Sequence, residues 1–129
     1  MKGMTAGTSD RSVYIVDDDE ASRDSLLILL EMNGIATRCF ASADAFLQSD
    51  TWDMACLLLD LHMPGMSGLE LLKVLRAAGI TQPIICISGG SDAQLDADVR
   101  KAGATALLYK PFGEETLLPA IRNAIAGKP

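Results

Sequence analysis

Residues 55–72, ACLLLDLHMPGMSGLELL, carry the clearest signal of the fold class. The first five residues are all apolar, which is typical of a strand that is buried on both faces. The run stops at Asp60. Ser67 and Glu70 then form a capping box, in which the hydroxyl and the carboxylate satisfy free backbone N–H groups at the start of a helix. The stretch therefore predicts a buried strand, a short loop and a helix over about residues 68–78.

The same alternation of strand and helix recurs along the chain. Predicted strands cover residues 12–16, 35–40, 55–59, 83–87 and 105–109. Predicted helices cover residues 20–33, 43–48 and 68–78, a fourth that follows a capping box of Ser91 and Gln94 and ends at 102, and a last one that ends near 126. Gly34, Gly79 and Gly103 stand where helices should stop. We expect a doubly wound α/β domain with a five-stranded parallel sheet in the flavodoxin-like order 2-1-3-4-5.

Length, charge and cysteine content narrow the class of protein. A chain of 129 residues is about one domain, and we expect a flexible leader over residues 1–11 and one folded domain over residues 12–127. The net charge of −6 opposes direct binding of nucleic acid by this domain. No apolar run approaches the roughly 20 residues of a membrane span, and no signal-peptide core is present. Cys39, Cys56 and Cys86 lack metal-ligand spacing and are expected to be small core residues, which favours a cytoplasmic setting.

Five polar residues stand where predicted strands end: Asp17, Asp18, Asp60, Ser88 and Lys110. Because the carboxyl ends of parallel strands lie along one edge of the sheet, these residues should converge on one site. Clustered carboxylates repel one another, and Mg²⁺ relieves that repulsion. A carboxylate can also attack phosphorus while a metal and a cation neutralise charge. This chemistry predicts Asp60 as the nucleophile and Lys110 as the cation.

Each of these residues also has a purely structural explanation. Acids after a strand can begin a helix, and Asp60 and Ser88 can be turn residues. Lys110 is harder to explain this way, since it precedes a proline at a strand end, where the peptide bond is a candidate for the cis form. The convergence of all five residues favours a functional site over separate structural roles.

Four segments resemble the motifs of bacterial response-regulator receiver domains: VYIVDDDE, LLLDLHMPGMSGLELL, ICISGG and AGATALLYKPF. They follow one another in that family's order and spacing over nearly all of residues 12–126. Their style is similar to that of receivers attached to helix-turn-helix output domains. The resemblance implies a cytoplasmic phosphoprotein of a two-component system, a regulatory domain rather than an enzyme, although self-phosphorylation and autodephosphorylation at the acceptor are conceivable.

The resemblance also implies a role for each site residue. Asp60 would become a 4-aspartylphosphate by accepting the phosphoryl group of a sensor histidine kinase or phosphotransfer protein. Asp18, Asp60 and the backbone carbonyl of His62 would ligate Mg²⁺, with Asp17 acting mainly through a bound water. Lys110 would pair with the phosphoryl group and Ser88 would bond one of its oxygens. Asp19 matches only a loop position, and the His62 side chain would face solvent.

This chain departs from the family pattern at two places. Leu107 stands three residues before Lys110, where the family has an aromatic residue that reports phosphorylation. Strand alternation puts Tyr109 on the same side, toward a surface made by the fourth helix, fifth strand and fifth helix. We expect that surface to meet a partner or a second copy of the chain, with Tyr109 as a contact. Pro119 predicts a late or bent start of the last helix, with Thr116 as its cap.

Two other functions remain open on the sequence alone. A phosphohydrolase that uses Asp60 as nucleophile often carries a second Asp two residues later, but that position is His62. A receiver-like interaction module that does not use phosphate is opposed by the retained acids, hydroxyl and lysine. The sequence also leaves open whether the chain is a single-domain regulator or the receiver of a longer one.

Overall fold

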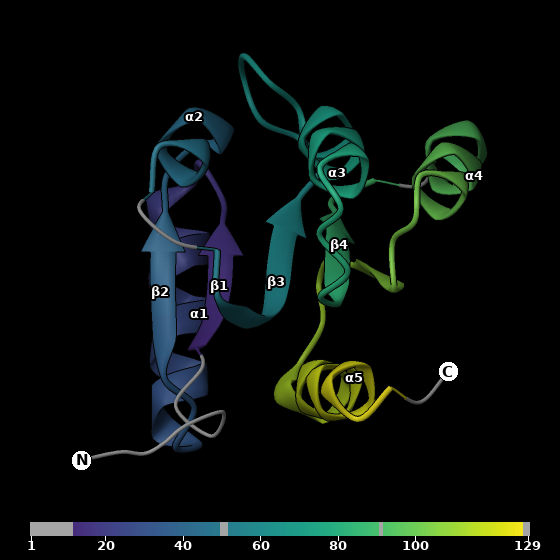
Figure 1. The fold of residues 1–129 in the computed structure, drawn as a ribbon. Coiled ribbons are helices and arrows are strands. Elements are labelled where there is room, and N and C mark those ends of the chain that lie inside the picture. The colour runs from purple at the N-terminus through teal and green to yellow at the C-terminus, as the bar shows by residue number, and fades with distance from the viewer. Residues whose placement is uncertain (1–11, 50–51, 91, 128–129) are drawn as a thin grey trace.

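The computed structural model describes residues 12–49, 52–90 and 92–127 (Figure 1). Within these residues one parallel sheet has the order β2-β1-β3-β4-β5. Its strands are β1 (Ser12–Val16), β2 (Thr37–Phe40), β3 (Met54–Asp60), β4 (Ile84–Ser88) and β5 (Ala106–Tyr109). The predicted doubly wound sheet and its flavodoxin-like order are confirmed. The expected leader, residues 1–11, lies outside the described residues.

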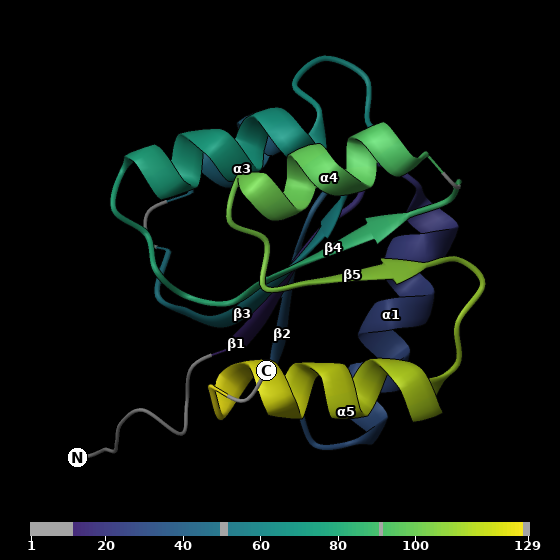
Figure 2. The same ribbon diagram turned by 90° about the vertical axis from the view of Figure 1, so that its right-hand side faces the viewer.

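Helices cover both faces of the sheet. They are α1 (Glu20–Met32), α2 (Ala43–Leu47), α3 (Gly68–Ala77), α4 (Ala93–Lys101) and α5 (Glu114–Ile125). Figures 1 and 2 show α1 and α5 on one face and the other three helices on the opposite face. Alternate residues of β3 enter the two resulting core layers: Leu57 and Leu59 pack toward α2, α3 and α4, whereas Cys56 and Leu58 pack toward α1 and α5. Burial on both faces explains the unbroken apolar run of this strand.

The predicted helix boundaries are accurate to a residue or two where a cap or a glycine sets them. Ser67 caps α3 as expected: its Oγ accepts from the Glu70 N–H at 3.2 Å, and the Glu70 carboxylate accepts from the Ser67 N–H at 2.9 Å. Gly34, Gly79 and Gly103 all adopt positive φ after their helices. For α4 the prediction named Ser91, which lies outside the described residues. The cap is Asp92, whose Oδ1 accepts from two backbone N–H groups at the helix start.

The prediction for the last helix was wrong about where it begins. α5 starts at Glu114 rather than at Thr116, and Pro119 lies inside it. The Gly113 carbonyl accepts from the backbone N–H groups of Thr116 and Leu117, which closes the first turn. Two acidic residues in that turn, Glu114 and Glu115, favour the positive end of the helix. The buried face of the helix packs into the core, which also stabilises the helix and offsets the cost of the proline, which is exposed. That buried face consists of Leu117, Leu118, Ile121 and Ala124.

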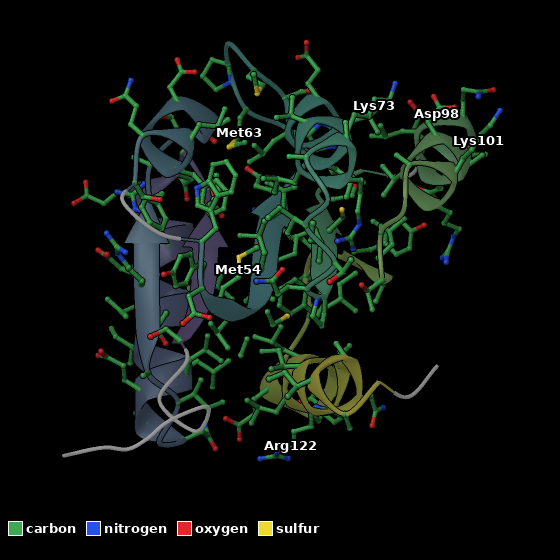
Figure 3. All side chains as sticks on the ribbon, in the orientation of Figure 1. Met54, Met63, Lys73, Asp98, Lys101 and Arg122 are labelled. Atoms are coloured by element: carbon green, nitrogen blue, oxygen red, sulfur yellow. The ribbon has the colours of Figure 1, made fainter. Side chains whose placement is uncertain are left out.

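The carboxyl ends of the strands lie at one edge of the sheet, where the polar residues follow. Figure 3 marks this direction, because Met54 begins β3 and Met63 lies in the loop beyond its far end. Cys56 and Cys86 are buried, as expected, and burial raises the pKa of both thiols to about 12, whereas Cys39 is half-buried. None of the helices in the described part of the chain has the length and apolar character needed to cross a membrane.

Candidate functional site

Three aspartates meet at the edge of the sheet where β1 and β3 end. Asp17 and Asp18 directly follow β1, and Asp60 is the last residue of β3. The two strands are neighbours in parallel register, with Val16 beside Leu59. One carboxylate oxygen from each aspartate therefore lies within 4.8 Å of the other two. Residues separated by more than forty positions in the sequence form one acidic group.

Asp17 is held firmly and is 1% exposed. Its Oδ1 accepts from the Asp19 N–H at 2.9 Å, and its backbone carbonyl accepts from Arg23 Nη1 at 2.8 Å. Its Oδ2 is buried and has no hydrogen-bond partner in the described part of the chain. The Lys110 ammonium group approaches that oxygen, with its Nζ at 3.9 Å. A buried carboxylate oxygen without a donor is costly unless a cation is available to it.

Asp60 has an unusual electrostatic environment for an aspartate. Burial, together with the negative charges of Asp17 and Asp18, raises its pKa to about 6, although the His62 N–H and the Lys110 ammonium oppose the shift. The His62 N–H donates to Asp60 Oδ1 at 3.2 Å. The carboxylate is thus destabilised as an anion until a further positive charge approaches.

The start of α3 fixes the backbone of Asp60. A Cβ atom at Gly68 would lie 2.3 Å from the Asp60 carbonyl oxygen and 2.7 Å from Leu61 Cα. The Gly68 N–H donates to the Leu61 carbonyl at 3.3 Å. Only glycine permits this approach, so the first residue of α3 holds the end of β3 in place. The sequence indicated Gly68 only as the start of a helix, because a contact across a loop leaves no local pattern.

These carboxylates fit a divalent cation with oxygen ligands. Mg²⁺ uses one or two carboxylates and keeps several waters. Here Asp18 is exposed, whereas Asp17 and Asp60 are buried. The unpartnered Asp17 Oδ2 and the raised pKa of Asp60 both indicate a group that lacks positive charge. The residues present are therefore suited to hold Mg²⁺.

Lys110 follows β5 and lies across the site from the acids. Its Nζ is 3.9 Å from Asp17 Oδ2 and donates to Ser22 Oγ at 3.4 Å. Its backbone N–H donates to the Ser88 carbonyl at 2.8 Å, which ties the ends of β4 and β5 together. The bond between Lys110 and Pro111 is cis. The Lys110 side chain is about one-third exposed, so it remains accessible to a ligand at the acidic group.

Ser88 ends β4 and is 1% exposed. Its hydroxyl lies 3.1 Å from the Gly90 carbonyl and 3.2 Å from the Gly90 N–H. The Nε2 atom of His62 lies 3.3 Å from the same hydroxyl. His62 is an exposed loop residue, yet its ring lies against Ser88 at the end of β4, a contact that sequence spacing did not reveal.

Leu107 and Tyr109 lie on β5, on the α4 side of the sheet. Leu107 is buried in the core layer that includes Val99 of α4. Tyr109 is 42% exposed, and its hydroxyl donates to Asp96 of α4. That hydrogen bond is the main reason that the pKa of Tyr109 is raised. The apolar residue is therefore internal and the aromatic residue is on the surface.

A cavity of about 380 Å³ adjoins the site. It lies between the first turns of α1 and the loop after β5, and its lining includes Ser22, Ser25, Leu26, Lys110, Pro111 and Phe112. Lys110 is therefore shared between the cavity wall and the acidic group.

The sequence of this chain is similar to those of known proteins. The chain matches the response regulator receiver domain family over residues 13–122. It is 41% identical over 114 residues to the transcriptional regulatory protein FixJ of Azorhizobium caulinodans, covering 88% of this chain and 54% of that protein. It is 46% identical over 115 residues to the response regulator protein TmoT of Ectopseudomonas mendocina, covering 88% and 52%. The chain spans about half the length of these relatives.

Solved structures give the same result. The crystal structure of FixJ-N has a TM-score of 0.83 at 40% identity, covering 92% of this chain and 96% of that one. A CheY-like response regulator receiver domain protein from Methanospirillum hungatei has a TM-score of 0.84 at 28% identity, covering 91% and 94%.

Proposed function

The chain belongs to the response regulator receiver domain family, and on that basis we propose that Asp60 is the residue that accepts a phosphoryl group. The domain is a phosphoacceptor switch of the two-component type and not an enzyme that releases a product. Its output is a change of conformation.

The position of Asp60 between two neighbouring strands carries this proposal. β3 lies between β1, which positions Asp17 and Asp18, and β4, which positions Ser88. A phosphoryl group on Asp60 would therefore have metal-binding carboxylates on one side and a hydroxyl donor on the other. Asp17 is less accessible to a donor, because it is 1% exposed whereas Asp60 is 6% exposed.

The transfer requires a nucleophilic carboxylate and neutralisation of the transferring charge. A carboxylate oxygen of Asp60 forms the new P–O bond while the P–N bond of a phosphohistidine breaks, and the departing imidazole nitrogen keeps the bonding electron pair. The Lys110 ammonium would pair with the phosphoryl oxygens, and the Ser88 hydroxyl would donate to one of them. When bound, Mg²⁺ would supply positive charge to the acids and the phosphoryl group.

Receiver domains bind Mg²⁺ at an acidic pocket, and this chain has such a cluster. We propose Asp18, Asp60 and the His62 carbonyl as its direct ligands, with Asp17 acting through water. The unpartnered Asp17 Oδ2 and the raised pKa of Asp60 support this assignment.

The cavity beside Lys110 suits the phosphodonor protein. We propose that a sensor histidine kinase or phosphotransfer protein places its histidine-bearing helix against Ser25, Leu26 and Phe112. Ser25→Trp would fill this space while leaving Asp60 intact. We expect it to slow transfer from a purified histidine kinase but not from acetyl phosphate. Equal rates from the kinase in both proteins would rule out this docking position.

The α4–β5–α5 surface, made of residues 93–101, 106–109 and 114–125, is the proposed output surface. Tyr109 is its exposed aromatic residue and is bonded to Asp96. We propose that phosphorylation promotes association there, with a second copy or another partner. Tyr109→Ala should weaken phosphorylation-dependent association measured by light scattering. Unchanged association would remove Tyr109 from the interface.

The acceptor proposal is tested by incubation with Mg²⁺ and acetyl phosphate, followed by intact-mass measurement. A persistent adduct of one phosphoryl group that Asp60→Asn abolishes is the expected result. Turnover of the donor without a persistent adduct would indicate a phosphohydrolase, and no reaction would indicate a module that does not use phosphate.

A further inference from the structure

The His62 ring contacts the Ser88 hydroxyl at the end of the sheet. The loop after β3 brings them together, because the Leu61 N–H donates to the Ile87 carbonyl at 2.9 Å and so aligns the two strand ends. His62 Nε2 then lies 3.3 Å from Ser88 Oγ. We propose that the His62 side chain is a positioning residue that holds the Ser88 hydroxyl in its resting orientation and competes with a phosphoryl group for it.

The Ser88 hydroxyl has three hydrogen-bond partners within reach in the resting state, and two of them can compete for its single proton. A serine hydroxyl donates one hydrogen bond and accepts two. Its partners are the Gly90 N–H at 3.2 Å, the Gly90 carbonyl at 3.1 Å and His62 Nε2 at 3.3 Å. If the hydroxyl donates to the Gly90 carbonyl, Nε2 carries a proton and donates to Oγ. If Nε2 carries no proton, the hydroxyl donates to Nε2 instead and the proton stays on Oγ.

A phosphoryl group can engage Ser88 only by displacing a partner. Its oxygens accept hydrogen bonds but carry no donor when ionised, so they need the serine proton. In one arrangement the hydroxyl donates that proton to the Gly90 carbonyl while the ring N–H donates to Oγ, whereas in the other the hydroxyl donates it to His62 Nε2. In both cases the contact with His62 stabilises the resting orientation of the hydroxyl.

The size of the effect follows from the strength of one hydrogen bond. His62 is exposed, so its ring can leave Ser88 without opening the core. A net hydrogen bond of ordinary strength changes an equilibrium about twofold to tenfold. Removing the ring nitrogen should therefore strengthen the binding of a phosphoryl mimic by about that factor. The His62 backbone carbonyl and N–H remain in every variant, so the proposed metal ligand is retained.

The inference rests on the proposed function of Asp60 and deepens it. Beryllofluoride, a non-transferable mimic of the phosphoryl group, would be titrated into Mg²⁺-saturated protein. His62→Ala and His62→Phe should both bind it about twofold to tenfold more tightly than wild type. Phenylalanine keeps a ring but lacks the nitrogen, so it separates the effect of losing the hydrogen bond from the effect of losing the ring that shields Ser88. Wild-type affinity in His62→Phe would overturn the proposal.

The Ser88→Ala variant tests whether His62 acts through the serine hydroxyl. There the hydroxyl is absent, so adding His62→Phe should leave beryllofluoride affinity unchanged. An equal gain in both backgrounds would show that His62 acts without Ser88 and would refute the proposal.

A second readout separates this inference from the function of Asp60. In metal-free protein, the Gly90 amide resonance should shift in His62→Phe, because Gly90 donates to the same hydroxyl. If wild type bound no beryllofluoride, the acceptor role of Asp60 would fail instead. An unchanged Gly90 resonance would then refute the His62 contact independently.

Discussion

Asp60→Asn should stabilise the metal-free protein at neutral pH, although it removes the proposed acceptor. The Asp60 carboxylate is destabilised by burial and by two neighbouring acids. An asparagine has nearly the same shape, and its Oδ1 can still accept from the His62 N–H. In the wild-type protein this N–H lies 3.2 Å from Asp60 Oδ1. The substitution removes the buried negative charge and keeps the hydrogen bond.

The pKa of Asp60 sets both the size and the pH dependence of the effect. Raising it from the usual 3.8 to about 6 disfavours the ionised folded state by up to about 3 kcal/mol. The folded state binds the proton more tightly than the unfolded state, so this contribution is favourable below pH about 4. It is lost as pH rises through about 6. The advantage of Asp60→Asn should therefore be near zero at pH 4 and about 1–3 kcal/mol at pH 7.

Urea unfolding at pH 4, 5, 6 and 7 in the presence of a chelator measures the difference. Asp24→Asn removes an exposed acid on α1 and serves as the matched control, with little expected change. Adding Mg²⁺ should stabilise wild type more than Asp60→Asn, because only wild type has all three carboxylates. A stabilisation that is independent of pH, or a loss of stability in Asp60→Asn at pH 7, would refute this account of the site.

Three further predictions concern the metal site and its supports. Mg²⁺ affinity, measured by calorimetry, should fall as pH drops below about 6, because a proton then competes for Asp60; constant affinity down to pH 5 would contradict this. Gly68→Ala should lower the free energy of unfolding by about 1–3 kcal/mol and weaken Mg²⁺ binding, because the alanine Cβ would overlap the Asp60 carbonyl. Wild-type stability together with wild-type Mg²⁺ affinity would show that α3 can move away. Arg76→Ala should lower the free energy of unfolding by about 2–4 kcal/mol in urea unfolding, because its guanidinium donates to three backbone carbonyls at the ends of α3, β4 and α4. Lys73→Ala on the same helix should change it little (Figure 3), and equal effects of the two substitutions would refute the prediction.

The sequence predicted the positions of the candidate site residues best where strand order alone determines them. Asp17, Asp60 and Ser88 each follow or end a strand of β1, β3 or β4, and these strands are adjacent in the sheet. The unbroken apolar run of β3 and the capping box of Ser67 are local signals, and the strand and the helix start that they predict are both confirmed. Parallel pairing then brings the strand ends together without further information from the sequence.

Contacts between loops and helices could not be predicted in this way. The ring of His62 reaches Ser88 across 26 positions, and Arg76 reaches Gly103 across 27, with no periodicity to reveal either pair. α5 begins earlier than the proline at 119 predicts, because the buried face of this helix packs into the core. These features depend on tertiary packing, which overrides local preferences.

The acceptor residue itself can be mapped chemically. After reaction with acetyl phosphate and Mg²⁺, borohydride reduces an aspartyl phosphate to homoserine, and peptide mass spectrometry locates the change. Homoserine at position 60, absent when Mg²⁺ is withheld, is the predicted result. Homoserine at position 17 or 18, or at no position, would contradict the assignment of Asp60 as the phosphoacceptor of this receiver domain.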